Sequence, residues 1–135
     1  MDTLSNDEMP VPIYFSRRNG VTCAGVSLGV DIWGATGLND VSKMRAVLIE
    51  CVSVCGAKMR NIDLFQFGGA GGVAGVAILM QSHLSVHTWP EHGYAAFDAF
   101  MCGDADPYKM IPLLKQAFSP KQIQLTEHVR GLMCP

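Results

Sequence analysis

The chain has 135 residues, of which 49% are hydrophobic and 16% are charged, and its formal net charge is −2 at pH 7. The length predicts one domain with its own core, and the composition excludes an intrinsically disordered chain. The charge gives no basic surface for nucleic acid, and no apolar run is long enough to cross a membrane. Five cysteines without framework spacing, in a chain whose first residues do not resemble a secretion signal, predict a cytoplasmic protein with reduced thiols.

The chain begins with a polar segment. We expect residues 1–20 to form an N-terminal arm, because this segment carries Pro10 and Pro12 and little apolar surface. Residues 21–135 are then a single domain. Its first element is a strand at residues 21–33, where the run is β-branched and apolar.

A helix follows this strand. Asn39 or Asp40 supplies the N-terminal cap, and Gly56 supplies the C-terminal cap. Charged residues occupy one face, so the helix is expected to cover one side of a sheet. Its apolar stripe, at spacings of three and four, consists of Val41, Met44, Val47, Leu48, Cys51, Val52 and Cys55.

Four further strands are predicted between the two helices of the chain. They lie at residues 58–67, 76–80, 84–89 and 94–101, and a turn at residues 90–93 separates the last two. In the last strand, alternate side chains divide between two faces. One face carries Asp98, Phe100 and Cys102, and the other carries Phe97, Ala99 and Met101.

A second helix and a last strand complete the predicted fold. Asp106 caps a helix at residues 107–118, and Pro112 is expected to bend it. Residues 121–129 alternate as a strand. The order β-α-β-β-β-β-α-β, with hairpins dominating, predicts an α+β two-layer sandwich with helices on one face of a mainly antiparallel sheet.

The strands at residues 76–80 and 94–101 are too apolar to face water on one side. We therefore expect a homodimer that buries sheet against sheet. The alternative is a monomer with a few exposed apolar side chains.

Two other patterns favour packing over chemistry. The glycine-rich run at residues 68–75 contains no lysine and leads into a strand, so it does not predict a phosphate-binding loop. Cys51 and Cys55 lie on an apolar helix stripe, which favours core packing over a metal site. His83, His87 and Cys102 form a weak candidate triple for zinc, and we expect no metal.

Polar side chains are concentrated in one segment that is otherwise apolar. Such groups reduce stability unless they are paired or used, so the set indicates a functional site rather than a hydrogen-bonded network alone. It consists of Ser82, His83, Ser85, His87, Glu91, Asp98 and Cys102.

The segment SHLSVHTWPEHGYAAFDAFMCG closely resembles the self-processing region of the prokaryotic S-adenosylmethionine decarboxylase proenzymes. The similarity extends to LGVDIWGATGLND, GGVAG and TEHVRG and covers residues 28–131. It implies a pyruvoyl-dependent lyase of spermidine biosynthesis that is made as a zymogen and cleaved autocatalytically.

The resemblance implies cleavage between Gln81 and Ser82. Ser82 would attack the Gln81 carbonyl, and elimination from the resulting ester would leave a β chain of residues 1–81 and an α chain of residues 82–135. The α chain would begin with a covalent pyruvoyl group made from Ser82, which is the cofactor and forms a Schiff base with the substrate amine. The two cleaved chains are then partners of each other.

The resemblance also assigns roles to other residues. His87 is the proton acceptor in processing, and Cys102 is the proton donor in catalysis. Glu91 matches the carboxylate that binds the ribose hydroxyls of the substrate. Phe67 and Trp89 are candidates to face its sulfonium group.

Two positions depart from the family pattern. Gln81 stands where the family usually has glutamate, and Ala74 stands where a hydroxyl assists processing. The odd separation of Ser82 and His87 places them on opposite faces of a continuous strand, so the mechanism requires a break near residues 81–83. The alternatives are the same scaffold acting on arginine or ornithine, and an unprocessed, non-catalytic regulatory paralogue.

Overall fold

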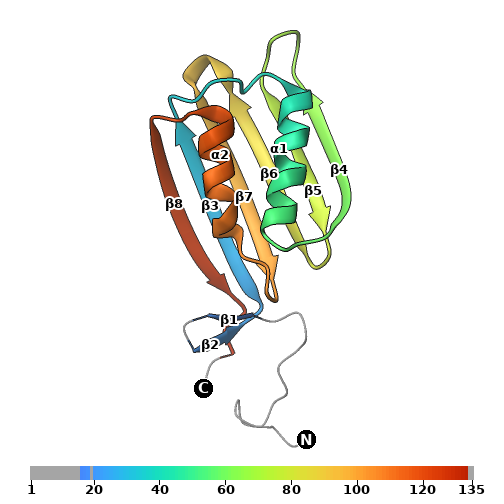
Figure 1. The fold of residues 1–135 in the computed structure, drawn as a ribbon, viewed down its shortest axis with the longest axis vertical. Helices are drawn as coiled ribbons and strands as arrows, with labels where there is room; N and C mark the ends of the chain where they lie inside the picture. Colours follow the sequence, from blue (N-terminus) through green and yellow to red (C-terminus); the bar gives the residue numbers. More distant parts are fainter. Residues whose placement is uncertain (1–15, 19, 134–135) are drawn as a thin grey trace, which may run out of the picture.

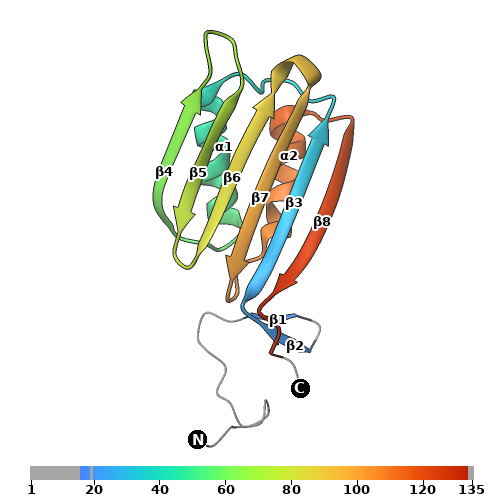
Figure 2. The same cartoon turned by 180° about the vertical axis from the view of Figure 1, so that it is seen from behind.

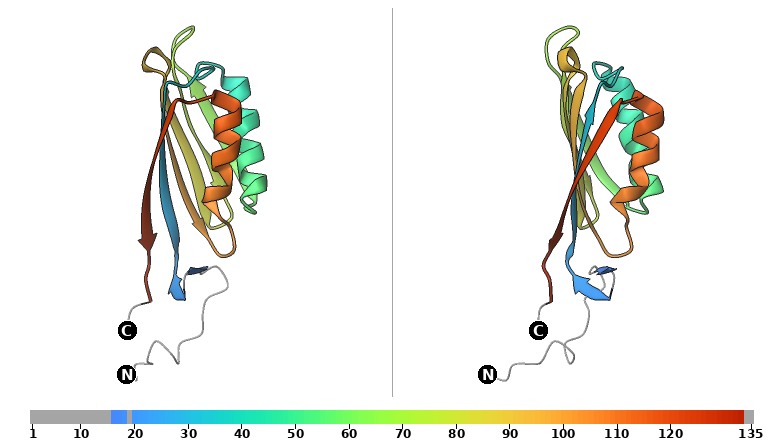
Figure 3. Two further views of the ribbon diagram at one scale, coloured as in Figure 1. Left: turned by 60° about the vertical axis from the view of Figure 1, so that its left-hand side comes forward. Right: turned by 90° about the vertical axis from the view of Figure 1, so that its left-hand side faces the viewer.

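The structure is a computed structural model that describes residues 16–18 and 20–133. It consists of one six-stranded sheet, in the order β4-β5-β6-β7-β3-β8, with two α-helices packed on one face (Figures 1 and 3). All neighbouring strands of this sheet are antiparallel. The other face is uncovered when the sheet is viewed from behind (Figure 2). This arrangement confirms the predicted α+β class and the predicted order of elements.

The elements of the sheet and the helices are as follows. The strands are β3 (Gly25–Trp33), β4 (Met59–Gln66), β5 (Val73–Leu79), β6 (Ser82–Trp89), β7 (Tyr94–Cys102) and β8 (Gln122–Arg130). The helices are α1 (Val41–Val54) and α2 (Ile111–Phe118), with short 3₁₀ segments η1 (Pro90–His92) and η2 (Pro107–Met110). A separate hairpin consists of β1 (Ser16–Arg18) and β2 (Val21–Cys23).

Helix α1 begins and ends where the sequence predicts. The Asp40 carboxylate accepts a hydrogen bond from the backbone N–H of Lys43 at 3.0 Å, which satisfies one of the free N–H groups at the helix start. Gly56 follows the last turn with a φ of 81°, a left-handed conformation that favours glycine. The predicted stripe faces the sheet, and its fully or nearly fully buried members are Met44, Leu48, Cys51, Val52 and Cys55.

The core lies between the helices and the sheet. In β7 the alternation confirms the predicted faces, because Phe97 and Met101 are buried whereas Asp98 is exposed. Phe97 packs against Phe118 of α2 with ring centroids 6.2 Å apart. The helix-facing side chains of the central strands therefore hold β6 and β7 in a fixed position.

The strand predicted at residues 21–33 is two strands, not one. The backbone N–H of Ala24 points to the carbonyl oxygens of Arg130 and Gly131, at 2.9 and 3.0 Å. Strand β2 therefore ends at Cys23 and β3 begins at Gly25, because the Ala24 N–H bonds to the end of β8 and is not available to continue the pairing of β2 with β1. Residues 1–15 of the predicted arm lie outside the described residues, and Ser16–Arg18 form β1.

Two other boundaries differ from the prediction. The helix predicted at residues 107–118 divides into η2 and α2, and Pro112 stands in the first turn of α2. Proline is tolerated there because its missing N–H has no partner in the helix, so Pro112 produces no internal bend. Strand β5 starts at Val73, earlier than expected, because backbone pairing with β4 extends through the second half of the glycine-rich run.

The uncovered face of the sheet carries large apolar side chains, which include Phe65, Ile78 and Trp89 with exposed fractions of 62%, 49% and 41%. Ile78 belongs to the strand predicted at residues 76–80, so an exposed apolar side chain is confirmed there, whereas the exposed side chain of β7 is Asp98. The expected homodimer stays a prediction. Within the part of the chain that the structure describes, no helix has the length and apolar character needed to cross a membrane.

Candidate active site

The predicted cleavage site lies in a tight turn at one end of the sheet. Leu79 of β5 pairs with Ser82 of β6, so Met80 and Gln81 alone connect the two strands. Gln81 has a φ of 60°, in the left-handed region that non-glycine residues rarely adopt. This conformation costs about 1–2 kcal/mol. The Gln81–Ser82 peptide bond is therefore held at a strained position.

Cys102 is the last residue of β7, and it contacts both sides of this peptide bond. Its thiol donates a hydrogen bond to the carbonyl oxygen of Gln81 at 2.9 Å. Its backbone N–H donates to the Ser82 hydroxyl oxygen at 3.3 Å. The structure thus brings Gln81, Ser82 and Cys102 together, although residues 81 and 102 are far apart in the sequence.

The protonation state of Cys102 suits a proton donor. Burial raises the pKa of this thiol, the hydrogen bond from Ser82 lowers it, and the nearby Cys23 raises it again, with a net increase. The thiol is consequently protonated at neutral pH, which is consistent with its donating to the Gln81 carbonyl.

Gly25 permits the close approach of β3 to this site. It pairs with Cys102 on one side and with Arg130 of β8 on the other. A Cβ at Gly25 would overlap the carbonyl oxygen of Met101 and lie 3.3 Å from the Cys102 sulfur. Sequence reasoning did not single out this glycine, because only the register of β3 against β7 reveals its role.

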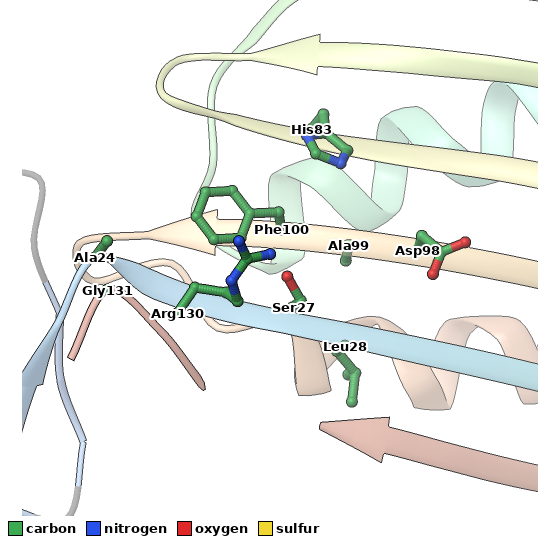
Figure 4. Close-up of a pocket in the computed structure, with 9 residues that line it drawn as sticks. All are labelled: Ala24, Ser27, Leu28, His83, Asp98, Ala99, Phe100, Arg130 and Gly131. Atoms are coloured by element: carbon green, nitrogen blue, oxygen red, sulfur yellow. The ribbon is translucent and has the colours of Figure 1, made fainter. Parts of the chain in front are cut away.

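A groove of about 600 Å³ opens on the uncovered face beside the turn (Figure 4). His83, Phe100 and Arg130 line it from three strands, and Ser27 of β3 and Asp98 of β7 also line it. His83 follows Ser82 directly, and its ring lies 6.1 Å from the Phe100 ring. The groove therefore leads from the predicted cleavage site across the open sheet face.

His87 lies apart from Ser82. The break predicted near residues 81–83 is the turn that ends at Gln81, with its φ of 60°. Strand β6 then runs without interruption from Ser82 to Trp89, so this break does not bring His87 to Ser82. The five-residue separation corresponds to about 16 Å along a strand. Within one chain, the imidazole of His87 is thus too far to act on Ser82.

His87 instead joins the residues that were predicted to bind substrate. Phe67, Trp89 and Glu91 line a second cavity, of about 340 Å³, together with His87. Ala74, the position of the missing hydroxyl, pairs directly with His87 across β5 and β6 and lines the same cavity. One chain therefore carries the predicted residues in two groups, at opposite ends of β6.

An aromatic stack, which sequence reasoning missed, borders this second cavity. The Tyr94 ring lies between those of Trp33 and Trp89, with centroids 4.3 and 5.1 Å away. The Tyr94 hydroxyl donates a hydrogen bond to Asp31 at 2.7 Å, and this bond is the main cause that raises the pKa of Tyr94 to about 12. The three residues meet on the uncovered face because β7 pairs with β3 on one side and with β6 on the other.

The other cysteine pair belongs to the core. Burial raises the pKa of Cys51 to about 12 and that of Cys55 to about 11, so both thiols are protonated at neutral pH. Among the described residues, no group of three or more histidine, cysteine and acidic side chains is arranged to hold a metal ion.

The fold and the serine–thiol turn define a small α+β enzyme, and comparisons with known proteins identify its family. The fold resembles the crystal structure of the adenosylmethionine decarboxylase from Aquifex aeolicus, with a TM-score of 0.70 and 31% identity over 79% of this chain and 90% of that one. Residues 26–131 match the family model described as S-adenosylmethionine decarboxylase.

Curated relatives agree with this match. The chain is 36% identical to the S-adenosylmethionine decarboxylase proenzyme of Thermomicrobium roseum, over 77% of this chain and 90% of that protein. It is also 36% identical to the proenzyme of the same name from Methanococcus maripaludis, over 81% and 91%. The chain therefore belongs to the S-adenosylmethionine decarboxylase family.

Proposed function

We propose that this chain is a proenzyme that cleaves itself between Gln81 and Ser82 and then decarboxylates S-adenosylmethionine, giving the aminopropyl donor for spermidine synthesis. Family membership supports the reaction, and it supports a pyruvoyl group formed from serine as the cofactor. The observation that carries the cleavage site is the 2.9 Å hydrogen bond from the Cys102 thiol to the Gln81 carbonyl, beside the Ser82 hydroxyl.

The chemistry of cleavage follows from this contact. The Ser82 hydroxyl oxygen attacks the Gln81 carbonyl carbon, the C–N bond breaks, and the amide becomes an ester with a free amino group on Ser82. The thiol of Cys102 points at the oxygen that becomes negative during this attack, so it stabilises the oxyanion. Breaking the bond also releases the left-handed strain at Gln81.

The ester then has to lose a proton. A base removes the Ser82 α-proton, the ester C–O bond breaks to leave a carboxylate on Gln81, and water replaces the amino group on residue 82 as ammonia leaves. This leaves a pyruvoyl group on the α chain. Cys102 already makes hydrogen bonds to the Ser82 hydroxyl and to the Gln81 carbonyl. The residues at this turn are therefore compatible with a pyruvoyl group at position 82.

We propose that the base is His87 of a second copy. Two uncovered sheet faces that meet with their strands running in opposite directions would lay the His87 end of one β6 over the Ser82 end of the other. The exposed Ile78, Trp33 and Trp89, at 49%, 40% and 41%, support such a sheet-to-sheet homodimer. Each site would then contain residues from both copies.

Decarboxylation would use Ser82 and Cys102 of one copy together with the second group of residues from the other copy. The pyruvoyl group at residue 82 would supply an electrophilic carbonyl that withdraws electrons from the substrate as carbon dioxide leaves. Cys102 donates a proton to the substrate carbon, since its raised pKa keeps the thiol protonated. Glu91 binds the ribose hydroxyls, and the aromatic faces of Phe67 and Trp89 contact the sulfonium group.

Release of labelled carbon dioxide tests the substrate. The purified, processed chain is incubated separately with carboxyl-labelled S-adenosylmethionine, arginine and ornithine. We expect release from S-adenosylmethionine alone, and a Ser82→Ala variant serves as the control without a pyruvoyl group. Release from arginine or ornithine, or no release from a fully cleaved protein, would contradict the proposed function.

A further inference from the structure

The β1–β2 hairpin lies at the end of the sheet where β6 begins and β7 ends (Figures 1 and 2). It precedes the residues that match the family model, which start at residue 26. Ser16 and Cys23 pair across the hairpin, and both are buried, with exposed fractions of 5% and 0%. The hairpin is thus packed against the rest of the molecule at the predicted active site.

One hydrogen bond connects the hairpin to the turn that carries the thiol. The Ser16 hydroxyl donates to the carbonyl oxygen of Gly103 at 2.7 Å. Gly103 directly follows Cys102 and has a φ of 62°. Within the turn, the backbone N–H of Ala105 donates to the Cys102 carbonyl oxygen at 3.3 Å. Because glycine has more conformational freedom than any other residue, the Ser16 hydroxyl adds a restraint at the most flexible position of this turn.

Further backbone bonds fix the hairpin itself. The carbonyl oxygen of Thr22 accepts from the N–H of Met133 at 2.9 Å, and the N–H of Ala24 donates to the carbonyl oxygen of Arg130. After cleavage between residues 81 and 82, the hairpin would belong to the β chain and these partners to the α chain. The hairpin therefore joins the two chains beside Cys102.

We propose that Ser16 is a positioning residue for the Cys102 thiol; the inference rests on the proposed function of Cys102 as proton donor. The Ser16–Gly103 hydrogen bond, which is partly buried, restrains the turn after Cys102 and so helps to aim the thiol at the Gln81 carbonyl before cleavage and at the substrate carbon afterwards. Without the hydroxyl, the Gly103 carbonyl would lack this bond, and the turn would move away from the hairpin.

Two measurements test this role, and one of them needs no cofactor. The first is the alkylation rate of Cys102 as a function of pH, followed by peptide mass spectrometry in an uncut Ser82→Ala background. Loss of the Ser16–Gly103 hydrogen bond should free the turn and expose the thiol, so Ser16→Ala should raise this rate. We expect an increase of about tenfold, which corresponds to the net free energy of one hydrogen bond. The second is catalysis by the processed enzyme, where Ser16→Ala should lower kcat by a similar factor and leave KM unchanged.

Matched variants separate positioning from a general loss of structure. Ser16→Thr retains the hydroxyl and should keep both values near those of the parent. Ser16→Val has the shape of the threonine variant without its hydroxyl and should behave like Ser16→Ala. Ser53→Ala, at an exposed position on α1, should change neither value. The threonine–valine pair decides the question if the alanine variant folds poorly.

Several results would overturn the proposal. The first is that Ser16→Val and Ser16→Thr have the same alkylation rate and the same kcat. The second is that Ser16→Ala and Ser16→Val both unfold, which would make the role of the hydroxyl purely structural. The alkylation result does not depend on turnover. A response of Cys102 to Ser16 in a protein that does not decarboxylate S-adenosylmethionine would therefore refute the proposed function and not the positioning role.

Discussion

At the scale of the residue, one thiol is placed to act in two steps. Cys102 contacts the scissile carbonyl in the uncut chain, at 2.9 Å from Sγ to the Gln81 oxygen. Burial raises the pKa of the thiol, and both oxyanion stabilisation and carbon protonation require the protonated form. The proposed roles of Cys102 in maturation and in turnover therefore require the same protonated thiol.

Replacing Cys102 separates these two steps. From the sequence alone, Cys102→Ala is expected to leave much of the self-cleavage intact while turnover falls by roughly 10²–10⁴. Because the Cys102 thiol donates a hydrogen bond to the Gln81 carbonyl, we also expect slower cleavage in Cys102→Ala, which has no side-chain donor to the oxyanion. Cys102→Ser retains a donor and should cleave at nearly the parent rate while decarboxylating poorly. Time courses of cleavage by gel electrophoresis measure this, and equal rates for the alanine variant and the parent would argue against the oxyanion role.

At the scale of the element, the register of the strands decides what the site contains. Leu79 pairs with Ser82, which leaves a two-residue turn and forces Gln81 into the left-handed region. Turns of this length commonly use glycine or asparagine, because these residues adopt positive φ at low cost. A glutamine here stores strain directly beside the bond that is expected to break.

Gln81→Gly tests whether the strain matters. Glycine adopts this conformation without a steric penalty, so the free energy of unfolding should rise by about 1 kcal/mol in an uncut Ser82→Ala background. With Ser82 present, the glycine variant should cleave more slowly than the parent because less strain is released. Urea unfolding and cleavage kinetics give the two values. Faster cleavage with glycine would show that the strain does not assist the reaction.

The order and faces of the elements could be predicted from the sequence, because hydrophobic periodicity and capping residues are local signals. Asp40, Gly56 and the alternation in β7 are examples. The break at Ala24 could not be predicted, since it depends on hydrogen bonds to the distant Arg130 and Gly131. The β1–β2 hairpin was missed although the dipeptide Asn19-Gly20 is a hairpin signal.

The candidate site was predicted less completely than the fold. The family resemblance named Ser82, His87 and Cys102, but only the register shows that Cys102 reaches the cleavage turn and that His87 does not. The grouping of Glu91 with His87 in one cavity likewise depends on where η1 lies after the end of β6. Distances between elements are set by tertiary pairing, which a single sequence does not reveal.

At the scale of the whole molecule, the uncovered sheet face connects the two groups of residues. The cleavage turn and the second cavity lie at opposite ends of β6, and exposed apolar side chains lie between them. A homodimer formed through this face would explain both the apolar surface and the separation of His87 from Ser82.

A pair of isoleucine variants tests this assembly. Ile78 on the uncovered face and Ile49 on α1 have similar exposed fractions, 49% and 47%. Ile78→Glu places a charge in the proposed interface, so it should give a monomer and lose self-cleavage, whereas Ile49→Glu should behave like the parent. Sedimentation velocity measures the mass in solution. A monomeric parent, or a dimeric Ile78→Glu variant that cleaves normally, would contradict the shared site.

The most direct test of self-cleavage at Ser82 is the intact mass of the purified chain. We expect two species, residues 1–81 and residues 82–135, and a carbonyl-reactive group in place of the amino terminus of the second. The Ser82→Ala variant should give one uncut chain. A parent chain that is cut at a different bond, or that decarboxylates S-adenosylmethionine without being cut, would contradict the assignment of Ser82.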